Sequence, residues 1–160
     1  MRLYVLRHGI AEDGGAMPDS QRQLSGEGRE KLRKIMRHAA KAGLDPDVVI
    51  SSPYVRARQT TAIAVEELGF KGHVIETDSL VPFANPHQTW DMLREHRHAS
   101  QTLIVGHNPH LSDLLCLLTG ARAGAFEMKK AGLACLETLH TGPTPRASLA
   151  WLMTPKSVGA

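Results

Sequence analysis

The chain has 160 residues, of which 42% are hydrophobic and 22% charged, with a formal net charge of +3 at pH 7. This length suffices for one hydrophobic core and is short for two, and the composition excludes wholesale disorder. No apolar run is long enough to span a bilayer, and the first residues do not resemble a usual signal peptide. We therefore expect one cytoplasmic domain over residues 1–155, with a frayed tail at 156–160.

Positively charged residues are dispersed along the chain except over Arg29–Lys41. There they alternate with apolar residues at helical spacing, which indicates the solvated face of an amphipathic helix rather than a nucleic-acid patch. Cys116 and Cys135 lie in apolar stretches, so we expect two core thiols and neither a disulfide nor a metal site.

The apolar run Leu3–Leu6 predicts a buried strand at the start of the chain. Residues 10–23 are rich in Gly, Asp, Pro and Ser and predict a loop over the end of that strand. Ser25 is the expected N-cap of an amphipathic helix that ends near Gly43. Such a strand, loop and helix open the α/β alternation that continues below.

A second buried strand is predicted over Asp47–Ser51. Ser52 and Pro53 supply a cap and a first-turn proline, so a helix should begin there and run to about Leu68, with Gly69 as its stop.

Alternating strands and helices continue toward the C-terminus, which favours a largely parallel sheet covered by helices on both faces. The predicted elements are, in chain order, a weak strand at 73–75, a loop at 80–85, a helix from Asn85 to about Glu95, a strand at Thr102–Gly106 and a helix from Leu111 to Gly120. Short segments at 125–128, 132–138 and 147–153 then predict an antiparallel end to the sheet.

Two of the predicted strands are followed at once by a histidine. The first continues into Arg7-His8-Gly9, and the strand at Thr102–Gly106 continues into His107-Asn108. Because parallel strands end at the same edge of a sheet, these residues can converge on one pocket. Imidazole can attack phosphorus or relay a proton, and glycine lets the backbone approach a ligand closely.

Two arginines are expected at the same edge. Arg7 precedes the first histidine, and Arg56 lies in the first turn of the helix after the second strand. A helix start attracts anions through its free N–H groups and dipole, and a guanidinium clamps phosphate oxygens in a fork. Two histidines and two arginines around one anion predict a phosphate pocket.

Three segments resemble the signature segments of the histidine phosphatase superfamily: Arg7–Gly9, Ser51–Thr60 and Val105–Pro109. The resemblance extends to Arg22–Ser25 and to Trp151–Pro155, so it covers essentially the whole chain. Within the superfamily, the chain is similar to the small SixA-type protein-phosphohistidine phosphatases.

This resemblance implies a fold and a site. The fold is a three-layer α/β/α sandwich of the phosphoglycerate mutase-like kind, with a mostly parallel six-stranded sheet and an antiparallel strand toward the C-terminal end. Residues 1–155 would form a single histidine-phosphatase domain that needs no metal or other cofactor.

The resemblance also implies residue roles. His8 would be the nucleophile that forms a transient phosphohistidine. Arg7 and Arg56 would bind the phosphoryl oxygens, and His107 would donate a hydrogen bond to the phosphoryl group. Attack requires a neutral His8, and we expect its other ring nitrogen to donate to a backbone carbonyl. The expected substrate-binding residues are Gly9, Arg22, Ser25 and Asn108.

A missing acid bears on the substrate. Larger members of the superfamily carry an acidic residue after the third strand that protonates an alkoxide leaving group, whereas Ser79–Ala84 here contains no Asp or Glu. Imidazole, with a pKa of about 6.5, leaves far more readily than an alkoxide. We therefore expect the substrate to be phosphohistidine on a protein, such as an HPt-like phosphotransfer protein. Glu12, Asp13 and Asp19 remain alternative proton donors in the first loop.

Two other functions fit the same pocket: a small-molecule phosphomonoesterase or pyrophosphatase, and a non-catalytic phosphate-binding module. Each would hold a phosphate or sulfate anion there, and no nucleic acid or membrane partner is expected. His107, His110 and Asp113 have a spacing that a metal site can use, but we interpret His110 as a surface or capping residue. Arg58 is expected to be exposed.

Overall fold

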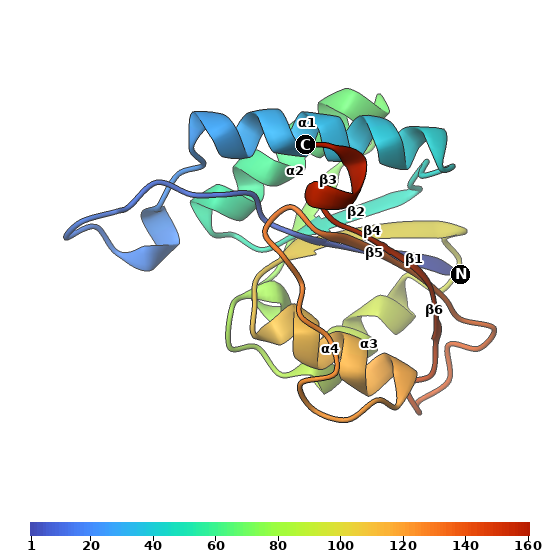
Figure 1. The fold of residues 1–160 in the computed structure, drawn as a ribbon. Helices are drawn as coiled ribbons and strands as arrows, with labels where there is room; N and C mark the ends of the chain where they lie inside the picture. The colour runs from blue at the N-terminus through green and yellow to red at the C-terminus, as the bar shows by residue number, and fades with distance from the viewer.

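Six strands form one sheet in the computed structural model, which describes residues 1–160 (Figure 1). The strands are β1 (Arg2–Arg7), β2 (Val48–Ser51), β3 (Val74–Glu76), β4 (Gln101–Gly106), β5 (Leu133–Glu137) and β6 (Ser148–Met153). Their spatial order is β3-β2-β4-β1-β5-β6. The first four are mutually parallel, whereas β5 runs antiparallel to both β1 and β6. The predicted mostly parallel sheet is confirmed.

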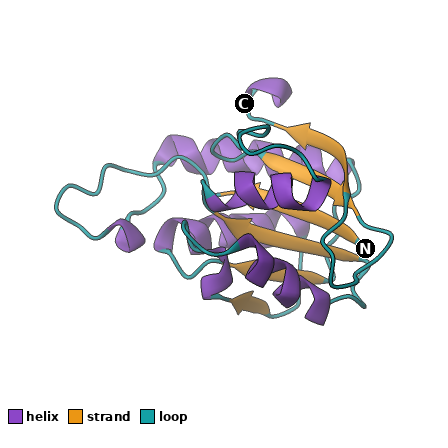
Figure 2. Cartoon of the chain, turned by 90° about the horizontal axis from the view of Figure 1, so that it is seen from below, coloured by secondary structure: helices purple, strands orange, loops and turns teal.

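Four α-helices cover the two faces of this sheet (Figures 1 and 2). They are α1 (Gly26–Lys41), α2 (Val55–Leu68), α3 (Pro86–Glu95) and α4 (His110–Thr119), with short 3-10 helices η1 (Asp19–Gln21), η2 (Asp78–Leu80) and η3 (Lys156–Val158). Helices α1 and α2 lie on one face, and α3 and α4 on the other, which makes the three-layer α/β/α sandwich. None of the helices is both long and apolar enough to cross a membrane.

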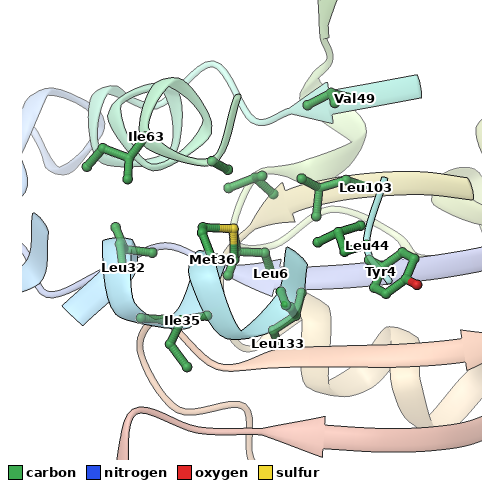
Figure 3. Close-up of a cluster of buried hydrophobic side chains, with 14 of the residues drawn as sticks. Tyr4, Leu6, Leu32, Ile35, Met36, Leu44, Val49, Ile63, Leu103 and Leu133 are labelled. Atoms are coloured by element: carbon green, nitrogen blue, oxygen red, sulfur yellow. The ribbon is translucent and has the colours of Figure 1, made fainter. Parts of the chain in front are cut away.

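Strand β1 is buried on both faces, which explains its uninterrupted apolar sequence. Tyr4 and Leu6 pack with α1 and α2, as Figure 3 shows, whereas Leu3 and Val5 belong to the cluster on the opposite face. The alternation follows from the two-residue period of a strand. The carboxyl end of β1 is thereby held rigidly between two cores.

The start and end of α1 follow the predicted signals. The Ser25 side chain accepts a hydrogen bond from the backbone N–H of Gly28 at 3.0 Å. After the last turn, Gly43 takes a left-handed φ of 92°, a conformation that costs glycine nothing.

Helix α2 begins at Val55, later than the sequence predicted, and Tyr54 is its N-cap. The Ser52 hydroxyl instead accepts from the N–H of Tyr54 at 3.3 Å in a local turn, and it also lies 2.7 Å from the His107 Nε2 atom. The predicted stop at Gly69 is confirmed, with φ of 66°.

The strand predicted over residues 125–128 is wrong. The backbone carbonyl of Met128 accepts from the side chains of Arg7 and Asn108, and its N–H donates to the Ser112 hydroxyl, so these groups are not free to join a strand ladder.

The tail after Pro155 also differs from the frayed segment that the sequence suggested. Residues Lys156–Val158 form η3, and Val158 packs against the core cluster beneath α1.

Candidate active site

The register of the sheet brings the two predicted histidines together. Arg7 pairs with Gly106 across β1 and β4, so the next residues, His8 and His107, lie side by side at the carboxyl edge. Their ring centroids are 5.0 Å apart. The backbone N–H of His8 also donates to the Gly106 carbonyl at 3.0 Å, which fixes the two strand ends to each other.

His8 is buried, and each of its ring nitrogens has one defined neighbour. Nδ1 lies 2.7 Å from the Gly9 carbonyl oxygen, which can only accept, so Nδ1 carries the proton. Arg56 Nε donates to Nε2 at 3.2 Å, which requires a lone pair on Nε2. Burial, followed by the charges of Arg56, Arg7 and Lys130, lowers the pKa of His8 to about 3. The ring is therefore neutral, with its lone pair at Nε2.

Arg56 reaches this pocket from the first turn of α2 and is itself only 5% exposed. Besides His8, its guanidinium donates to the backbone carbonyl of Asp19 at 2.6 Å and to the Asp19 carboxylate at 2.9 Å. The Tyr54 ring lies 5.3 Å from the guanidinium carbon. Asp19 thus occupies part of the fork with which Arg56 can bind an anion.

Arg7 points from the end of β1 toward the segment before β5. Its Nη1 atom donates to the Met128 carbonyl at 2.7 Å, and Asn108 Nδ2 donates to the same oxygen at 3.0 Å. The Arg7 Nε atom is buried and has no partner in the protein. One carbonyl therefore positions a guanidinium that keeps a donor available for a ligand.

His107 is 1% exposed and makes one polar contact, between Nε2 and the Ser52 hydroxyl at 2.7 Å. Its Nδ1 atom is buried without a partner, and its ring lies 4.9 Å from that of Tyr54, centroid to centroid. Burial first, and then the neighbouring His8 and Arg56, lower the pKa of His107 to about 2. This second imidazole is therefore neutral as well.

The predicted substrate-binding residues divide into two groups. Gly9 and Asn108 lie within the pocket wall, where Gly9 N–H donates to Thr60 Oγ1 at 3.2 Å. Arg22 is connected to the pocket through Asp19, whose carboxylate it contacts at 3.2 Å. Ser25 is not brought to the pocket, because its hydroxyl is engaged with Gly28 N–H and the Ile10 carbonyl.

His110 is buried, which corrects its interpretation as a surface residue. Its Nε2 atom lies 2.7 Å from the Thr89 hydroxyl, and burial lowers its pKa to about 4. No group of three or more His, Cys, Asp or Glu side chains is arranged to hold a metal ion. As expected, Arg58 is exposed, and it pairs with Glu76 at 2.8 Å.

Several pocket residues were missed or misinterpreted in the sequence. From the sequence alone, Asp19 is expected only as a proton donor, and Ser52 as a helix cap within a segment of the resemblance. Tyr54 and Thr60 lie within a segment of the resemblance, but nothing in their spacing shows that they touch a histidine or the backbone of Gly9. The Met128 carbonyl has no sequence signal, because every residue carries one.

The chain also matches known proteins in sequence. Residues 3–81 match the histidine phosphatase superfamily (branch 1). An uncharacterized protein from Picosynechococcus sp. is 30% identical over 145 residues, which cover 86% of this chain and 86% of the relative. With the pocket described above, this chain belongs to the histidine phosphatase superfamily.

Solved structures show which kind of fold it has within that superfamily. The protein histidine phosphatase SixA complexed with tungstate has a TM-score of 0.88 at 20% identity, over 99% of both chains. A putative phosphohistidine phosphatase SixA from Agrobacterium tumefaciens has a TM-score of 0.81 at 23% identity, over 96% of this chain and 98% of the other. A putative alpha-ribazole-5'-P phosphatase from Escherichia coli has a TM-score of 0.76 at 20% identity, over 97% and 98%. The fold is of the SixA type.

Proposed function

We propose that this chain is a phosphatase that takes the phosphoryl group from phosphohistidine on a protein and passes it through His8 to water. One observation carries the proposal: His8 presents a neutral ring with its lone pair at Nε2, and Arg56 donates to that same atom. A nucleophile beside a guanidinium suits phosphoryl transfer, which depends mainly on positioning and charge stabilisation.

The first step exchanges one nitrogen–phosphorus bond for another. The Nε2 lone pair of His8 forms a bond to phosphorus as the bond to the substrate imidazole breaks. If the other nitrogen of the substrate ring is protonated, that ring leaves as neutral histidine and no proton transfer is needed. Arg7 and Arg56 stabilise the negative charge of the phosphoryl oxygens, and His107 completes the wall of the pocket.

The second step returns the enzyme to its starting state. Water attacks phosphorus, the bond to Nε2 breaks, and the electron pair of that bond remains on His8. Inorganic phosphate leaves as the monoanion with both hydrogens of the water. The Gly9 carbonyl holds the Nδ1 proton of His8 throughout, which keeps Nε2 as the reacting atom.

The available acids favour phosphohistidine over a sugar phosphate. Residues 79–84 contain no carboxylate. Asp19 is the acid that reaches the pocket, and it lies against Arg56. Although partial burial raises the pKa of Asp19, the hydrogen bonds from Arg56 and Arg22 outweigh this effect and leave it below the ordinary value. An ionised Asp19 is a poor proton donor for an alkoxide, whereas imidazole needs none.

A small-molecule phosphatase is the second candidate. It is favoured by the match to the putative alpha-ribazole-5'-P phosphatase, which shows a similar fold in a protein named for a small substrate. The two candidates predict opposite substrate orders with the same pocket.

Turnover of a phosphohistidine protein and of several sugar phosphates, measured side by side with chelator present, tests the proposal. We expect faster turnover of the phosphohistidine protein. His8→Ala should abolish turnover of every substrate, and His38→Ala, on the exposed face of α1, should leave it unchanged. A base-quenched reaction should contain a phosphorylated His8. Faster turnover of the sugar phosphates would favour the second candidate, and no turnover by the wild-type chain would indicate a phosphate-binding module.

A further inference from the structure

A cavity of about 620 Å³ opens beside Arg7, and neither His8 nor His107 is among the residues that line it. Its charged side chains are those of Arg7, Lys31, Lys129, Lys130 and Lys156; no lining residue carries an acidic side chain, and the last residue of the given sequence, Ala160, also lines it. We call this cavity the lysine groove. Because Arg7 lines both the groove and the proposed phosphoryl pocket, a ligand bound at His8 borders the groove directly.

Four separate parts of the fold build the lysine groove. Arg7 comes from the end of β1, Lys31 from α1, Lys129 and Lys130 from the segment before β5, and Lys156 from η3. Figure 1 shows η3 lying beside α1 at this side of the sheet. The neighbouring backbone is well tethered, since Ala131 N–H donates to the His8 carbonyl at 3.0 Å. The convergence is therefore a property of the fold and not of one basic run in the sequence.

The positive charge of the groove is only partly balanced within the chain. Lys31 pairs with Glu27 at 2.7 Å, and Lys129 pairs with Glu127 at 2.7 Å, both on the outer surface. Lys130 and Lys156 are exposed and make no ion pair. Lys130 is near enough to His8 to contribute to the lowering of its pKa. An anionic ligand would supply the missing partners.

The type of cation indicates the type of anion. Lysine ammonium groups are point charges on flexible stems, whereas the rigid fork of arginine holds a carboxylate or a phosphate in one bidentate geometry. Apart from Arg7, every cation of the groove is a lysine. Such a lining fits several carboxylates at variable positions on a protein surface better than a single anion held in one fixed geometry.

Exposed apolar residues near the same edge favour a protein as the source of these carboxylates. Phe83 is 88% exposed in the loop after η2, and Met17 is 46% exposed in the loop after β1. The Pro82 carbonyl accepts from His110 N–H at the start of α4, which holds the Phe83 loop near the strand ends. Aromatic residues and methionine are enriched at protein interfaces, so these two exposed residues favour a protein partner.

We propose that the lysine groove docks an acidic stretch of the phosphoprotein, so that Asp or Glu residues flanking the phosphohistidine increase turnover. This inference rests on the proposed function and adds to it the charge of the substrate around the phosphoryl group.

Three phosphohistidine peptides that differ only in their flanking residues test it, with Glu, Gln or Lys on both sides. At low salt we expect the kcat/KM of the wild-type chain to be on the order of tenfold higher for the Glu peptide than for the Gln peptide. This difference should shrink as salt is added. The variant Lys130→Glu/Lys156→Glu should lose this preference and favour the Lys peptide. The control Lys34→Glu/Lys71→Glu changes the net charge equally outside the groove and should retain it.

Unphosphorylated versions of the same peptides separate this inference from the proposed function. Their binding, measured by fluorescence anisotropy, should follow the same order even if no peptide is hydrolysed. Equal binding and turnover of the Glu and Gln peptides by the wild-type chain would overturn the docking role and leave the phosphatase intact. The docking role is also wrong if the groove variant loses turnover of a sugar bisphosphate while its peptide preference is unchanged.

Discussion

At the scale of single residues, Asp19 occupies a position that the proposed substrate needs. Its carboxylate pairs with Arg56 at 2.9 Å and with Arg22 at 3.2 Å, although its own side chain is 55% exposed. A phosphoryl group bound to Arg56 must displace that carboxylate or lie beside it, and both are negative. Arg56 keeps its position without the carboxylate, because the Asp19 backbone carbonyl also holds it, at 2.6 Å.

Replacing this carboxylate should therefore strengthen anion binding. We expect Asp19→Asn to lower the inhibition constant of inorganic phosphate and the KM of phosphohistidine substrates by about threefold to tenfold, as expected for a contact worth on the order of 1 kcal/mol. The kcat on phosphohistidine should change little, because imidazole leaves without an acid. Asp13→Asn, in the same loop, is the control. Weaker phosphate inhibition of Asp19→Asn would show that the carboxylate helps to bind the anion.

The residues predicted from the sequence and those missed differ in a physical way. The sequence predicts the two histidines and two arginines of the pocket for two reasons. Imidazole and guanidinium groups are seldom needed for structure alone, and the strand ends next to them are recognisable. These residues are His8, His107, Arg7 and Arg56. The sequence favours a helix cap at Ser52, since a hydroxyl before a proline fits that role equally well. Only the three-dimensional arrangement shows that it contacts His107.

At the scale of elements, α1 and the segment after β1 approach each other closely at Gly28. A Cβ atom added there would overlap the Ile10 carbonyl oxygen and come within 2.9 Å of the Ile10 nitrogen. Ile10 follows Gly9, whose carbonyl orients the His8 ring. The first turn of α1 is thus connected to His8, the proposed nucleophile, through the backbone of Gly9 and Ile10.

We expect Gly28→Ala to lower the free energy of unfolding by about 1–3 kcal/mol, as for other overpacked sites, and to reduce kcat as Gly9 shifts. Gly26 begins the same helix, and a Cβ there meets nothing within 4 Å. Gly26→Ala should therefore be neutral or slightly stabilising, with unchanged kcat. Urea unfolding and steady-state kinetics on both variants check this; equal stability of the two would show that the backbone of Ile10 moves freely.

Elements with local signals were predicted well, and those that depend on tertiary contacts were not. Residues adjacent in the sequence determine where α1 begins and ends. The same holds for the Asn85 cap of α3. Residues 125–128 have an apolar character that suits a strand, but their backbone is recruited by Arg7 and Asn108 from other parts of the chain. No local sequence pattern predicts these hydrogen bonds from distant side chains.

At the scale of the whole molecule, folding keeps three histidines neutral. The pKa values of His8, His107 and His110 fall to about 3, about 2 and about 4, in each case mainly through burial. An unfolded histidine has a pKa of about 6.5, so below that pH the unfolded chain binds protons that the folded chain does not. The stability these groups contribute is fully present above pH 6.5 and is lost as the pH falls toward the folded values.

The chain should therefore unfold more easily in mild acid than its carboxylates alone predict. Between pH 7 and 5, each of the three histidines should reduce the free energy of unfolding by about 2 kcal/mol. This pH window lies above the ordinary pKa values of 3.8 for Asp and 4.5 for Glu. Urea unfolding at both pH values should show a smaller loss for His110→Gln, by about a third, because one of the three groups no longer titrates. His38→Gln removes an exposed histidine and should keep the wild-type loss; an unchanged loss in His110→Gln would mean that His110 accepts a proton in the folded chain.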